Sequence, residues 1–506
     1  MLSSKEAIQA SYDLVVIGGG INGAAVARDA ALRGLKVILL EKTDFGAGAS
    51  TKTSKLAHGG LRYLEQYEFG LVKESLYERN LLLKNASHLV SPLKFTFPVY
   101  THSARPLWQV NLGLYLYDFF SRDSELPNHC KLDTEQVVNN FPGIQSKGLV
   151  GGCCYYDAQM KDNRLVIENV LAAEMAGATI LNYAKVIKLL WNQRKIEGVI
   201  FRYDKSGNEI NIKSELVVNA TGAWSNEITD LESGVEHARV APTKGVHLVV
   251  PKMFPTGLIL RAPQDGRIFF VLPWEGYSLI GATDTFFNDP EATEVDKADV
   301  TYLLEAFHHH FPHFNIGAEA IISTFVGLRP LVANHHSKKP SLISRDHAIQ
   351  FSKGGLITVL GGKFTTHRKM AEEVVDRIIS HMDPLRVFKH CRTHELPLPG
   401  AIISDYNLEK ELEEVGLQKI QVDHLMQNYG QLAKKILEII KINPLEMQPI
   451  CSEHPHILAE LTYAIKFEHV KRMDDWLYRR TSIAYGSCQG KNNLEAVVEK
   501  FLPLSR

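Results

Sequence analysis

Several cationic or proton-accepting side chains stand in glycine- or proline-flanked turns, where the backbone rather than a helical face would aim them. Arg62 lies in HGGLRYLE and Arg329 in GLRPL. A guanidinium fork matches phosphate oxygens bidentately, so each arginine is a candidate phosphate ligand. The alternative for each is a salt bridge at the surface or between domains. His247 in KGVH has an unperturbed pKa suited to accepting a proton, although a lone histidine is more often structural.

Three further residues extend this set. Lys363 occupies a Gly-Gly-Lys turn at the start of a predicted helix, where burial and neighbouring cations would lower its pKa. Arg345 follows a predicted strand and is a third candidate phosphate ligand. Tyr63, next to Arg62, would either donate its phenol to a phosphate or pack in the core.

The stretch from residue 13 to residue 41 predicts a dinucleotide-binding unit. A short β-branched strand leads into Gly18, Gly20 and Gly23, then into a small-residue helix and a second strand that ends on Glu41. The glycines permit the tight turn, the approach of a pyrophosphate and close packing of helix on strand. This order of strand, turn, helix and acid is the context that the G-x-G-x-x-G motif requires. The alternative is a glycine-rich turn without a ligand, and the motif alone does not distinguish FAD from NAD.

The composition excludes several classes of protein. A length of 506 residues predicts two or three domains, and a formal net charge of -1 offers no electrostatic case for nucleic acid. No apolar run approaches 18 residues and no secretory signal precedes Tyr12, so we expect neither a spanning helix nor secretion.

The cysteines and a histidine cluster give no metal signal. The cysteines lack a C-x-x-C or zinc spacing, so we expect reduced thiols. His308, His309 and His310 fall on a predicted helix without an acid partner at i, i+4, so we expect a solvated face and no metal. The six cysteines are Cys130, Cys153, Cys154, Cys391, Cys451 and Cys488.

Hydrophobic patterning divides the chain into three kinds of structure. Residues 243–345 alternate as β segments around one helix near 302–311, which predicts a separate, mostly antiparallel sheet roofing the site. Beyond residue 400 the pattern becomes helical. Predicted strands elsewhere are 14–17, 37–40, 179–186, 216–219 and 356–360; predicted helices are 69–89, 162–176, 407–441 and 455–480.

Residues 105–120, RPLWQVNLGLYLYDFF, are strongly apolar and aromatic. They predict either a core helix or a helix that lies in a membrane interface, and the pattern alone favours the core.

Motifs spread along the chain resemble those of FAD-dependent glycerol-3-phosphate dehydrogenases, the aerobic respiratory family. The resemblance runs from about residue 10 to about residue 485, and GATD and STKTSK are conservative departures from the family's usual residues. The motifs are HGGLRYLE (58–65), NATGAW (219–224), KGVH (244–247), GATD (281–284), GLRPL (327–331), SRDH (344–347), GGKFTTHRK (361–369) and RMDDWLYRRT (472–481).

The resemblance implies an α/β (α+β) fold with a Rossmann-like FAD-binding domain of the glutathione-reductase and D-amino-acid-oxidase type. We expect this domain to be discontinuous, at 1–104, 150–242 and 345–392. The substrate or roof domain is expected at 105–149 and 243–344, and a C-terminal α-helical domain at 393–506.

The resemblance also implies the reaction, in which sn-glycerol 3-phosphate is oxidised to dihydroxyacetone phosphate by hydride transfer to FAD N5. It assigns catalysis to His247, Arg329 and Lys363 and leaves open whether His247 or Lys363 accepts the proton. Lys363 either contacts a substrate oxygen or stabilises the reduced flavin. The expected substrate ligands are Arg62, Tyr63, His247, Arg329, Arg345 and Lys363.

FAD is expected to bind non-covalently, since the family pattern for covalent attachment is absent. His58 is expected to touch flavin rather than substrate. The expected cofactor ligands are Gly18, Gly20, Ile21, Asn22, Gly23, Glu41, Ser50, Thr51, Ser54, His58, Gly59, Gly60, Val186, Ala220, Thr221, Gly222, Gly361, Gly362, Lys363, Phe364 and Thr365.

Three functions remain open at this stage. The first is a dehydrogenase that passes electrons to ubiquinone or another membrane quinone, as a homodimer attached to the cytoplasmic face of the inner (plasma) membrane. The second is an oxidase that uses O2 and releases H2O2, although such relatives carry a roof insertion that this chain lacks. The third, a tRNA- or protein-binding module with a structural flavin, is disfavoured because there is no basic stripe.

Overall fold

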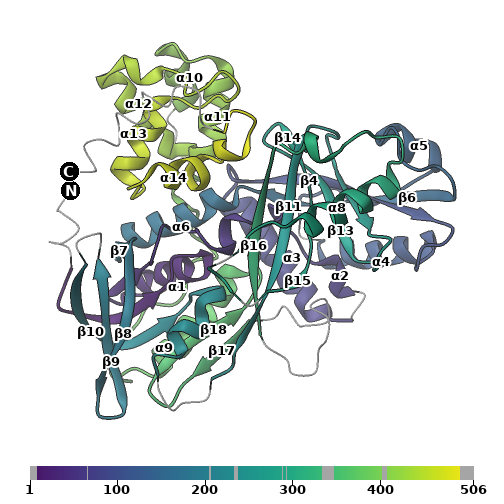
Figure 1. Cartoon of the computed structure of the whole chain (residues 1–506). Helices are drawn as coiled ribbons and strands as arrows, with labels where there is room; N and C mark the ends of the chain where they lie inside the picture. Colours follow the sequence, from purple (N-terminus) through teal and green to yellow (C-terminus); the bar gives the residue numbers. More distant parts are fainter. Residues whose placement is uncertain are drawn as a thin grey trace.

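The computed structural model describes residues 8–64, 67–122, 124–203, 207–232, 237–287, 289–291, 293–332, 347–401 and 407–489, with the side chain of Arg62 excepted. Two β-sheets with their helices lie side by side, and a bundle of helices from the C-terminal part of the chain packs on the first of them (Figure 1).

The first sheet is mainly parallel and contains the predicted dinucleotide unit. Strands β1, β2, β7, β10 and β18 run parallel, while β17 pairs antiparallel at one edge. The path is β17 (His347–Phe351), β18 (Leu356–Gly361), β10 (Asn208–Asn219), β1 (Ser11–Ile17), β2 (Val37–Leu40) and β7 (Thr179–Leu181), with β8 (Ala184–Asn192) and β9 (Lys195–Tyr203) attached beside β10.

Both faces of this sheet are covered, which explains its unbroken apolar strands. Leu14 and Val16 of β1 pack with the helices α1 (Ile21–Leu32), α6 (Asp162–Met175) and α9 (His367–Ser380). Val15 and Ile17 face the opposite way and pack against the β8–β9 hairpin. Side chains alternate across a strand, so burial on both faces requires apolar residues at every position.

The second sheet is mostly antiparallel and forms the roof. Its path is β15 (Thr285–Phe286), β11 (Val240–Pro251), β14 (Tyr277–Gly281), β13 (Ile268–Trp274), β12 (Gly257–Arg261), β4 (Val90–Tyr100), β6 (Leu149–Met160) and β3 (Leu56–Ala57); β16 (Ser323–Val332) pairs with β11 and β5 (Cys130–Leu132) with β6. Helices around the two sheets are α2 (Leu61–Leu64), α3 (Phe69–Asn85), α4 (Leu107–Phe120), α5 (Thr134–Asn140), α7 (Ser225–Thr229) and α8 (Lys297–His310).

The C-terminal part is helical, as the sequence predicts. It contains α10 (Leu408–Glu414), α11 (Lys419–Tyr429), α12 (Ala433–Ile442), α13 (Leu458–Phe467) and α14 (Met473–Trp476), followed by the short helical turns η8 (Leu477–Thr481) and η9 (Ile483–Tyr485). None of the helices in the described ranges is long and apolar enough to cross a bilayer.

Arginines of the RMDDWLYRRT motif fasten these helices to the first sheet. Asp44 follows β2, is fully buried, and accepts hydrogen bonds from Arg479 at 2.6 Å and from Arg480 at 2.9 Å. Burial opposes ionisation of Asp44, yet the two guanidinium groups lower the pKa of its carboxyl. A second buried pair, Arg164 with Glu468 at 2.7 Å, joins α6 to the loop after α13.

Sheet membership differs from the predicted domain boundaries, which otherwise stay a prediction. Strands β3, β4 and β6 were expected with the FAD-binding domain but pair within the roof sheet. The expected strand at 179–186 is two strands, β7 and β8, separated at Tyr183, whose φ is 57°.

Two expectations about cysteine and histidine are wrong. Cys130 and Cys154 face each other across β5 and β6 and are joined in a disulfide, with Cα atoms 5.1 Å apart. They are 24 residues apart in sequence, so only the strand pairing reveals them as neighbours. His310 is buried rather than solvated, and its Nε2 lies 2.8 Å from the Arg261 carbonyl oxygen.

Candidate active site

A cavity of about 1680 Å³ lies between the two sheets. Its floor is formed by residues at the carboxyl ends of β1, β2, β10 and β18, and its roof includes residues of β11 and β16. Ligands of open α/β sheets bind at this edge, so the cavity is where the sequence places a dinucleotide. The two ends of the cavity differ in how they are built.

The nucleotide end consists of the glycine turn between β1 and α1. Gly18 has a φ of 105° and donates its N–H to the Leu40 carbonyl at 2.8 Å. A Cβ on Gly23 would lie 1.9 Å from the Gly18 carbonyl oxygen, so only glycine allows this helix-to-strand contact. Ile21 N, in the first turn of α1, donates to Ser50 Oγ at 3.0 Å. Unsatisfied N–H groups at a helix start favour an anion such as a pyrophosphate.

Glu41 follows β2 and lines the same end of the cavity. Its carboxylate accepts hydrogen bonds from Gly19 N at 2.7 Å and from Thr43 N at 2.8 Å. Burial raises the pKa of Glu41, although these backbone N–H groups oppose the shift. The carboxylate is therefore fixed against the glycine turn, where an adenosine ribose is expected.

The middle of the cavity is made by loops from both sheets. Thr365 Oγ1 accepts the His58 backbone N–H at 3.2 Å, which joins the loop after β3 to the loop after β18. Thr221 donates its hydroxyl to Asn219 Oδ1 at 2.7 Å, which fixes the turn after β10. The predicted cofactor residues that line the cavity are Gly18, Gly20, Ile21, Asn22, Glu41, Ser50, Ser54, His58, Gly60, Val186, Ala220, Thr221, Gly222, Gly361, Gly362, Lys363, Phe364 and Thr365.

Three predicted cofactor residues are absent from the lining and support it from behind. Gly23 packs on Gly18, and the Thr51 hydroxyl donates to the Gly46 carbonyl at 3.0 Å. A Cβ on Gly59 would lie 2.2 Å from Leu76, so its role is close packing. Direct contact of these three with a cofactor stays a prediction.

His247 stands at the other end of the cavity, on β11. Its side chain is buried, its Nε2 lies 2.8 Å from Ser54 Oγ, and its ring stacks on Phe325 with centroids 4.8 Å apart. Burial and the positive charges of Arg329 and Lys55 hold its pKa well below the usual 6.5. The expectation of an unperturbed pKa is therefore wrong, and the imidazole is neutral at neutral pH.

Arg329 reaches the same end from β16, the strand beside β11. Its Nη1 donates to the Thr283 carbonyl and to Asp284 Oδ1, each at 3.1 Å. A Cβ on Gly245 would lie 2.4 Å from Arg329 Nη2, so the glycine of KGVH leaves room for the guanidinium. KGVH, GATD and GLRPL thus come from three neighbouring strands and meet at one place.

Lys363 follows β18 of the first sheet, and Tyr63 stands on α2 and packs against strands of the roof sheet. Lys363 Nζ lies 3.7 Å from the centroid of the Tyr63 ring and donates to Ser75 Oγ at 3.1 Å. Tyr63 is buried and lines the cavity together with Lys363. Tyr63 therefore contacts the cation while its ring also packs in a core cluster with Leu76.

Two predicted phosphate ligands are not placed. The side chain of Arg62 and the whole of Arg345 lie outside the part of the chain that the structure describes. Their roles stay predictions.

The structure adds residues that sequence reasoning missed. Lys55 is buried, donates to Asp162 Oδ1 at 2.8 Å, and contributes to the low pKa of His247. Lys52 and Asp284 line the cavity, and Asp284 orients Arg329. Lys52 and Lys55 stand in the STKTSK loop, and Asp284 is the last residue of GATD. All three lie in segments named above for the family resemblance, but no local spacing indicates a role for them.

Comparison with known families and proteins identifies relatives of this chain. Residues 13–376 match the family described as FAD dependent oxidoreductase, and residues 391–503 match the C-terminal domain of alpha-glycerophosphate oxidase. The glycerol-3-phosphate dehydrogenase of Synechocystis sp. is 37% identical over 94% of this chain and 89% of its own length. The aerobic glycerol-3-phosphate dehydrogenase of Staphylococcus haemolyticus is 34% identical over 97% of this chain and 91% of its own.

Solved structures share the fold. The glycerol-3-phosphate dehydrogenase of Bacillus halodurans, complexed with FAD, superposes with a TM-score of 0.78 at 27% identity, covering 99% of this chain and 90% of that one. The L-alpha-glycerophosphate oxidase of Mycoplasma pneumoniae, with FAD bound, is 17% identical with a TM-score of 0.59, over 77% of this chain and 100% of that one, and shows the fold alone.

The residues present fit FAD. The cavity has the volume for a dinucleotide, the glycine turn excludes side chains where a pyrophosphate would pass, and Gly222 turns with a φ of 58° and open space around its Cα. The relatives match over nearly the full length of the chain, and the chain belongs to the family of FAD-dependent glycerol-3-phosphate dehydrogenases.

Proposed function

We propose that this protein oxidises the secondary alcohol of sn-glycerol 3-phosphate to dihydroxyacetone phosphate. The observation that carries the proposal is that His247, Arg329 and Lys363 all line the cavity that also contains the dinucleotide turn. The substrate carbon loses a hydride and its hydroxyl loses a proton, so two electrons and two protons leave in all. FAD, when bound, supplies the acceptor for the hydride.

Arg329 binds the phosphate in this proposal. Its side chain is 27% exposed, lines the cavity and is held at one edge by Asp284, so an incoming anion can reach the guanidinium. Asp284 fixes the direction of the fork before substrate arrives. Arg62 and Arg345, which the sequence predicts as phosphate ligands, would add two more cations beside the same dianion.

His247 accepts the hydroxyl proton in this proposal. The neutral imidazole is ready to take a proton, whereas the cations that lower its pKa make the protonated form costly. A phosphate dianion paired with Arg329 offsets that positive charge, so substrate binding raises the basicity of His247. Ser54, 2.8 Å from Nε2, orients the ring.

Lys363 has a different role. Its cation is already held over the Tyr63 ring and bonded to Ser75. A fixed positive charge beside the first sheet suits stabilisation of negative charge on a reduced cofactor better than proton acceptance.

A direct assay tests this reaction. Purified protein with FAD and a soluble dye acceptor should convert sn-glycerol 3-phosphate to dihydroxyacetone phosphate. One electron pair should reach the dye for each dihydroxyacetone phosphate formed. The sn-1 phosphate enantiomer and glycerol serve as controls and should react far more slowly. Equal turnover of all three would contradict a phosphate-anchored, stereospecific site.

The electrons are proposed to pass to ubiquinone or another membrane quinone. In support, the cavity wall continues from the flavin end to apolar residues of α4, including Leu112, Tyr115 and Phe119. Such a wall suits the approach of an apolar acceptor from a lipid phase. The competing acceptor is O2, since the C-terminal family model is that of an oxidase.

Quinone and O2 are separated by their products. Two rates are compared with glycerol 3-phosphate present. Reduction of a short-chain quinone under nitrogen should be at least ten times faster than formation of H2O2 from O2 in air-saturated buffer. Stoichiometric H2O2 at a rate matching quinone reduction would make the protein an oxidase.

The exposed face of α4 is the proposed membrane contact. The pattern favoured a core helix, but only Asn111, Leu114 and Tyr117 of α4 are buried. Trp108, Leu112, Tyr115 and Phe119 are each about three-fifths exposed. They recur at intervals of three and four, which places them on one side of the helix. Lys73 and Arg122 lie over the neighbouring rings of Phe120 and Phe119, adding positive charge that suits anionic lipid headgroups.

Liposome binding tests this contact. Changing Trp108 to glutamate should release the protein from anionic liposomes while leaving dye-linked activity intact, because its side chain is exposed and does not line the cavity. The matched control changes Ile442 and Leu445, which are at least as exposed but lie on the C-terminal helices, and should leave binding unchanged. Equal binding of both variants would place the membrane contact elsewhere.

The cytoplasmic face of the inner membrane and a homodimeric assembly complete the proposal. Protease accessibility in inverted against right-side-out vesicles tests the first, and light scattering of the detergent-extracted protein tests the second.

A further inference from the structure

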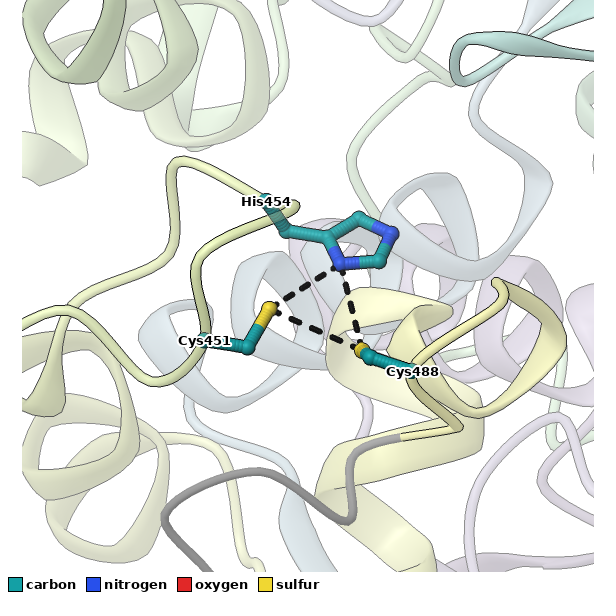
Figure 2. A group of neighbouring side chains, drawn as sticks. All are labelled: Cys451, His454 and Cys488. Atoms are coloured by element: carbon teal, nitrogen blue, oxygen red, sulfur yellow. Dashed lines mark hydrogen bonds between the residues drawn. The ribbon is translucent and has the colours of Figure 1, made fainter.

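Two cysteines and a histidine meet in the C-terminal helical part, far in sequence from the cavity. Cys451 and His454 lie in the loop before α13, and Cys488 follows η9. Figure 2 shows the three side chains pointing toward one centre, from two separate segments of chain. Cys451 and Cys488 are buried. The ligand atoms of all three lie within 4.8 Å of one another.

The spacing of the three atoms matches one face of a metal tetrahedron. The two sulfur atoms are 3.6 Å apart, and His454 Nδ1 is 3.1 Å from Cys451 Sγ and 3.4 Å from Cys488 Sγ. With Zn–S of about 2.3 Å and Zn–N of about 2.0–2.1 Å, tetrahedral edges are about 3.8 Å for S···S and about 3.6 Å for S···N. Each observed edge is shorter than the tetrahedral one by a few tenths of an ångström.

Hydrogen bonding accounts for two of the three contacts, because each thiol has one proton to donate. The imidazole Nδ1 carries either one proton or one lone pair, so it makes one good hydrogen bond and not two. Thiols are weak donors and weak acceptors, and their burial removes water as a competing partner. A cation at the centre would satisfy all three atoms at once.

A neighbouring cluster shows the contrast. His424 and His456 each place a ring nitrogen within 3.0 Å of Glu460 Oε2, and Tyr429 donates its hydroxyl to the same oxygen. Glu460 Oε1 accepts the Ile457 backbone N–H at 2.8 Å. Donors surround one carboxylate here, so a complete hydrogen-bond network explains the cluster without a metal.

We propose that Cys451, His454 and Cys488 bind a zinc ion, with water at the fourth position. Binding forms two Zn–S bonds and one Zn–N bond and releases the two thiol protons to solvent, with no change in oxidation state. Two thiolates cancel the charge of Zn²⁺, so the buried centre stays neutral. This ligand set favours zinc over magnesium or calcium, which prefer oxygen.

The ion would fasten the helical part to the roof behind His247. The segment that carries Cys488 also carries Tyr485, whose ring lies 5.3 Å from Phe325, the ring on which His247 stacks. Ser323 of β16 donates to the Tyr485 carbonyl at 2.6 Å. Ser487 N donates to the Tyr277 hydroxyl on β14 at 3.1 Å. Zinc would hold this segment to the loop at Cys451 and thereby support the wall of the active site.

Metal analysis of the FAD-loaded protein tests the proposal. Protein purified without chelator should carry about one zinc per chain, and Cys451→Ser or Cys488→Ser should lower this at least tenfold. Cys391 is not part of this cluster, so Cys391→Ser is the matched control and should keep its zinc. Cobalt-exchanged protein should show thiolate-to-cobalt charge-transfer absorption that both serine variants lose.

A measurement on the unmodified protein keeps the test decisive if the variants do not fold. Under native conditions an alkylating reagent should label Cys451 and Cys488 only after chelation, and chelation should lower the thermal midpoint. A protein without zinc that takes up no cobalt would overturn the proposal. So would a Cys451–Cys488 disulfide found by non-reducing peptide mapping, or full metal content in both serine variants.

Discussion

The two ends of the cavity are built in opposite ways. The nucleotide end comes from one continuous stretch, and its candidate ligand groups are backbone N–H groups of a glycine turn and one carboxylate, Glu41. The candidate substrate end takes His247 from β11 and Arg329 from β16, while Lys363 comes from the turn after β18. Local geometry specifies the first end, whereas the pairing of distant strands specifies the second.

This difference separates binding from chemistry. Damage at the nucleotide end should remove the cofactor and with it every activity. Damage at the substrate end should leave the cofactor bound and lower turnover, with an effect that depends on the residue changed. Variants at the two ends should therefore differ in whether the flavin is lost together with the activity.

Gly23→Ala should have the largest effect, because its Cβ would lie 1.9 Å from the Gly18 carbonyl oxygen. The helix and strand must separate, and flavin content should fall to a tenth or less, as read from absorbance after gel filtration. Gly70→Ala on α3 is the matched control, since its Cβ meets nothing within 4 Å. A yellow, active Gly23→Ala protein would show that the turn does not hold the cofactor in the way described.

His247→Asn should keep its flavin but lose activity by roughly a hundred- to ten-thousandfold in kcat, the usual contribution of a general base. In the wild-type protein, the acid limb of the pH profile should lie at lower pH than an ordinary histidine would give. Because the pKa of His247 lies well below 6.5, activity should hold as pH falls through 6.5 and decline only at lower pH. The profile of kcat/KM must be corrected for the phosphate monoester, whose second pKa is about 6. An acid limb at or above 6.5 that His247→Asn retains would exclude His247 as the base.

Arg329→Ala should lower kcat/KM for glycerol 3-phosphate by roughly ten- to a hundredfold, since hydrogen bonds to charged groups contribute about 1.5–3 kcal/mol. Glycerol lacks the phosphate, so its poor turnover should fall much less. Arg329→Lys should recover only part of the loss, because an ammonium cannot reproduce the fork. Equal proportional losses on both substrates would mean that Arg329 serves the fold or the flavin.

Acid should lower the free energy of unfolding through protonation of His367, which lies at the start of α9 beside the first sheet. Its Nδ1 lies 2.7 Å from the Phe364 carbonyl oxygen, and burial lowers its pKa to about 4. The unfolded chain, with an ordinary histidine pKa, binds more protons between pH 6.5 and pH 4, so stability falls as pH drops through that window. The loss should reach about 3 kcal/mol below pH 4. Chemical denaturation at several pH values measures it, and His367→Asn should show a correspondingly smaller pH dependence. An unchanged slope in the variant would assign the acid sensitivity to other groups.

Sequence reasoning succeeded where the determinants are local. The unit from β1 to Glu41, α6, α9 and the helical C-terminal part follow from apolar periodicity and glycine positions. The motifs around His247 and Arg329 also meet, and the motif around Lys363 lines the same cavity, because family resemblance supplied the long-range information that periodicity lacks.

It failed where a contact depends on strand pairing or on which face of an element is covered. Cys130 and Cys154 become neighbours only through β5 and β6, and Cys451 and Cys488 only through the packing of the helical part. The strands β4 and β6 read as part of the first domain until their partners are known. Helix α4 is apolar around its circumference, so its pattern did not reveal which face stays exposed.

We propose that one cavity holds both the flavin and glycerol 3-phosphate. Mixing the FAD-loaded protein with sn-glycerol 3-phosphate under nitrogen and following the flavin absorbance tests this arrangement. We predict rapid bleaching, with one dihydroxyacetone phosphate formed per flavin and with no bleaching by glycerol on the same timescale. Flavin that stays oxidised at saturating glycerol 3-phosphate would contradict the account.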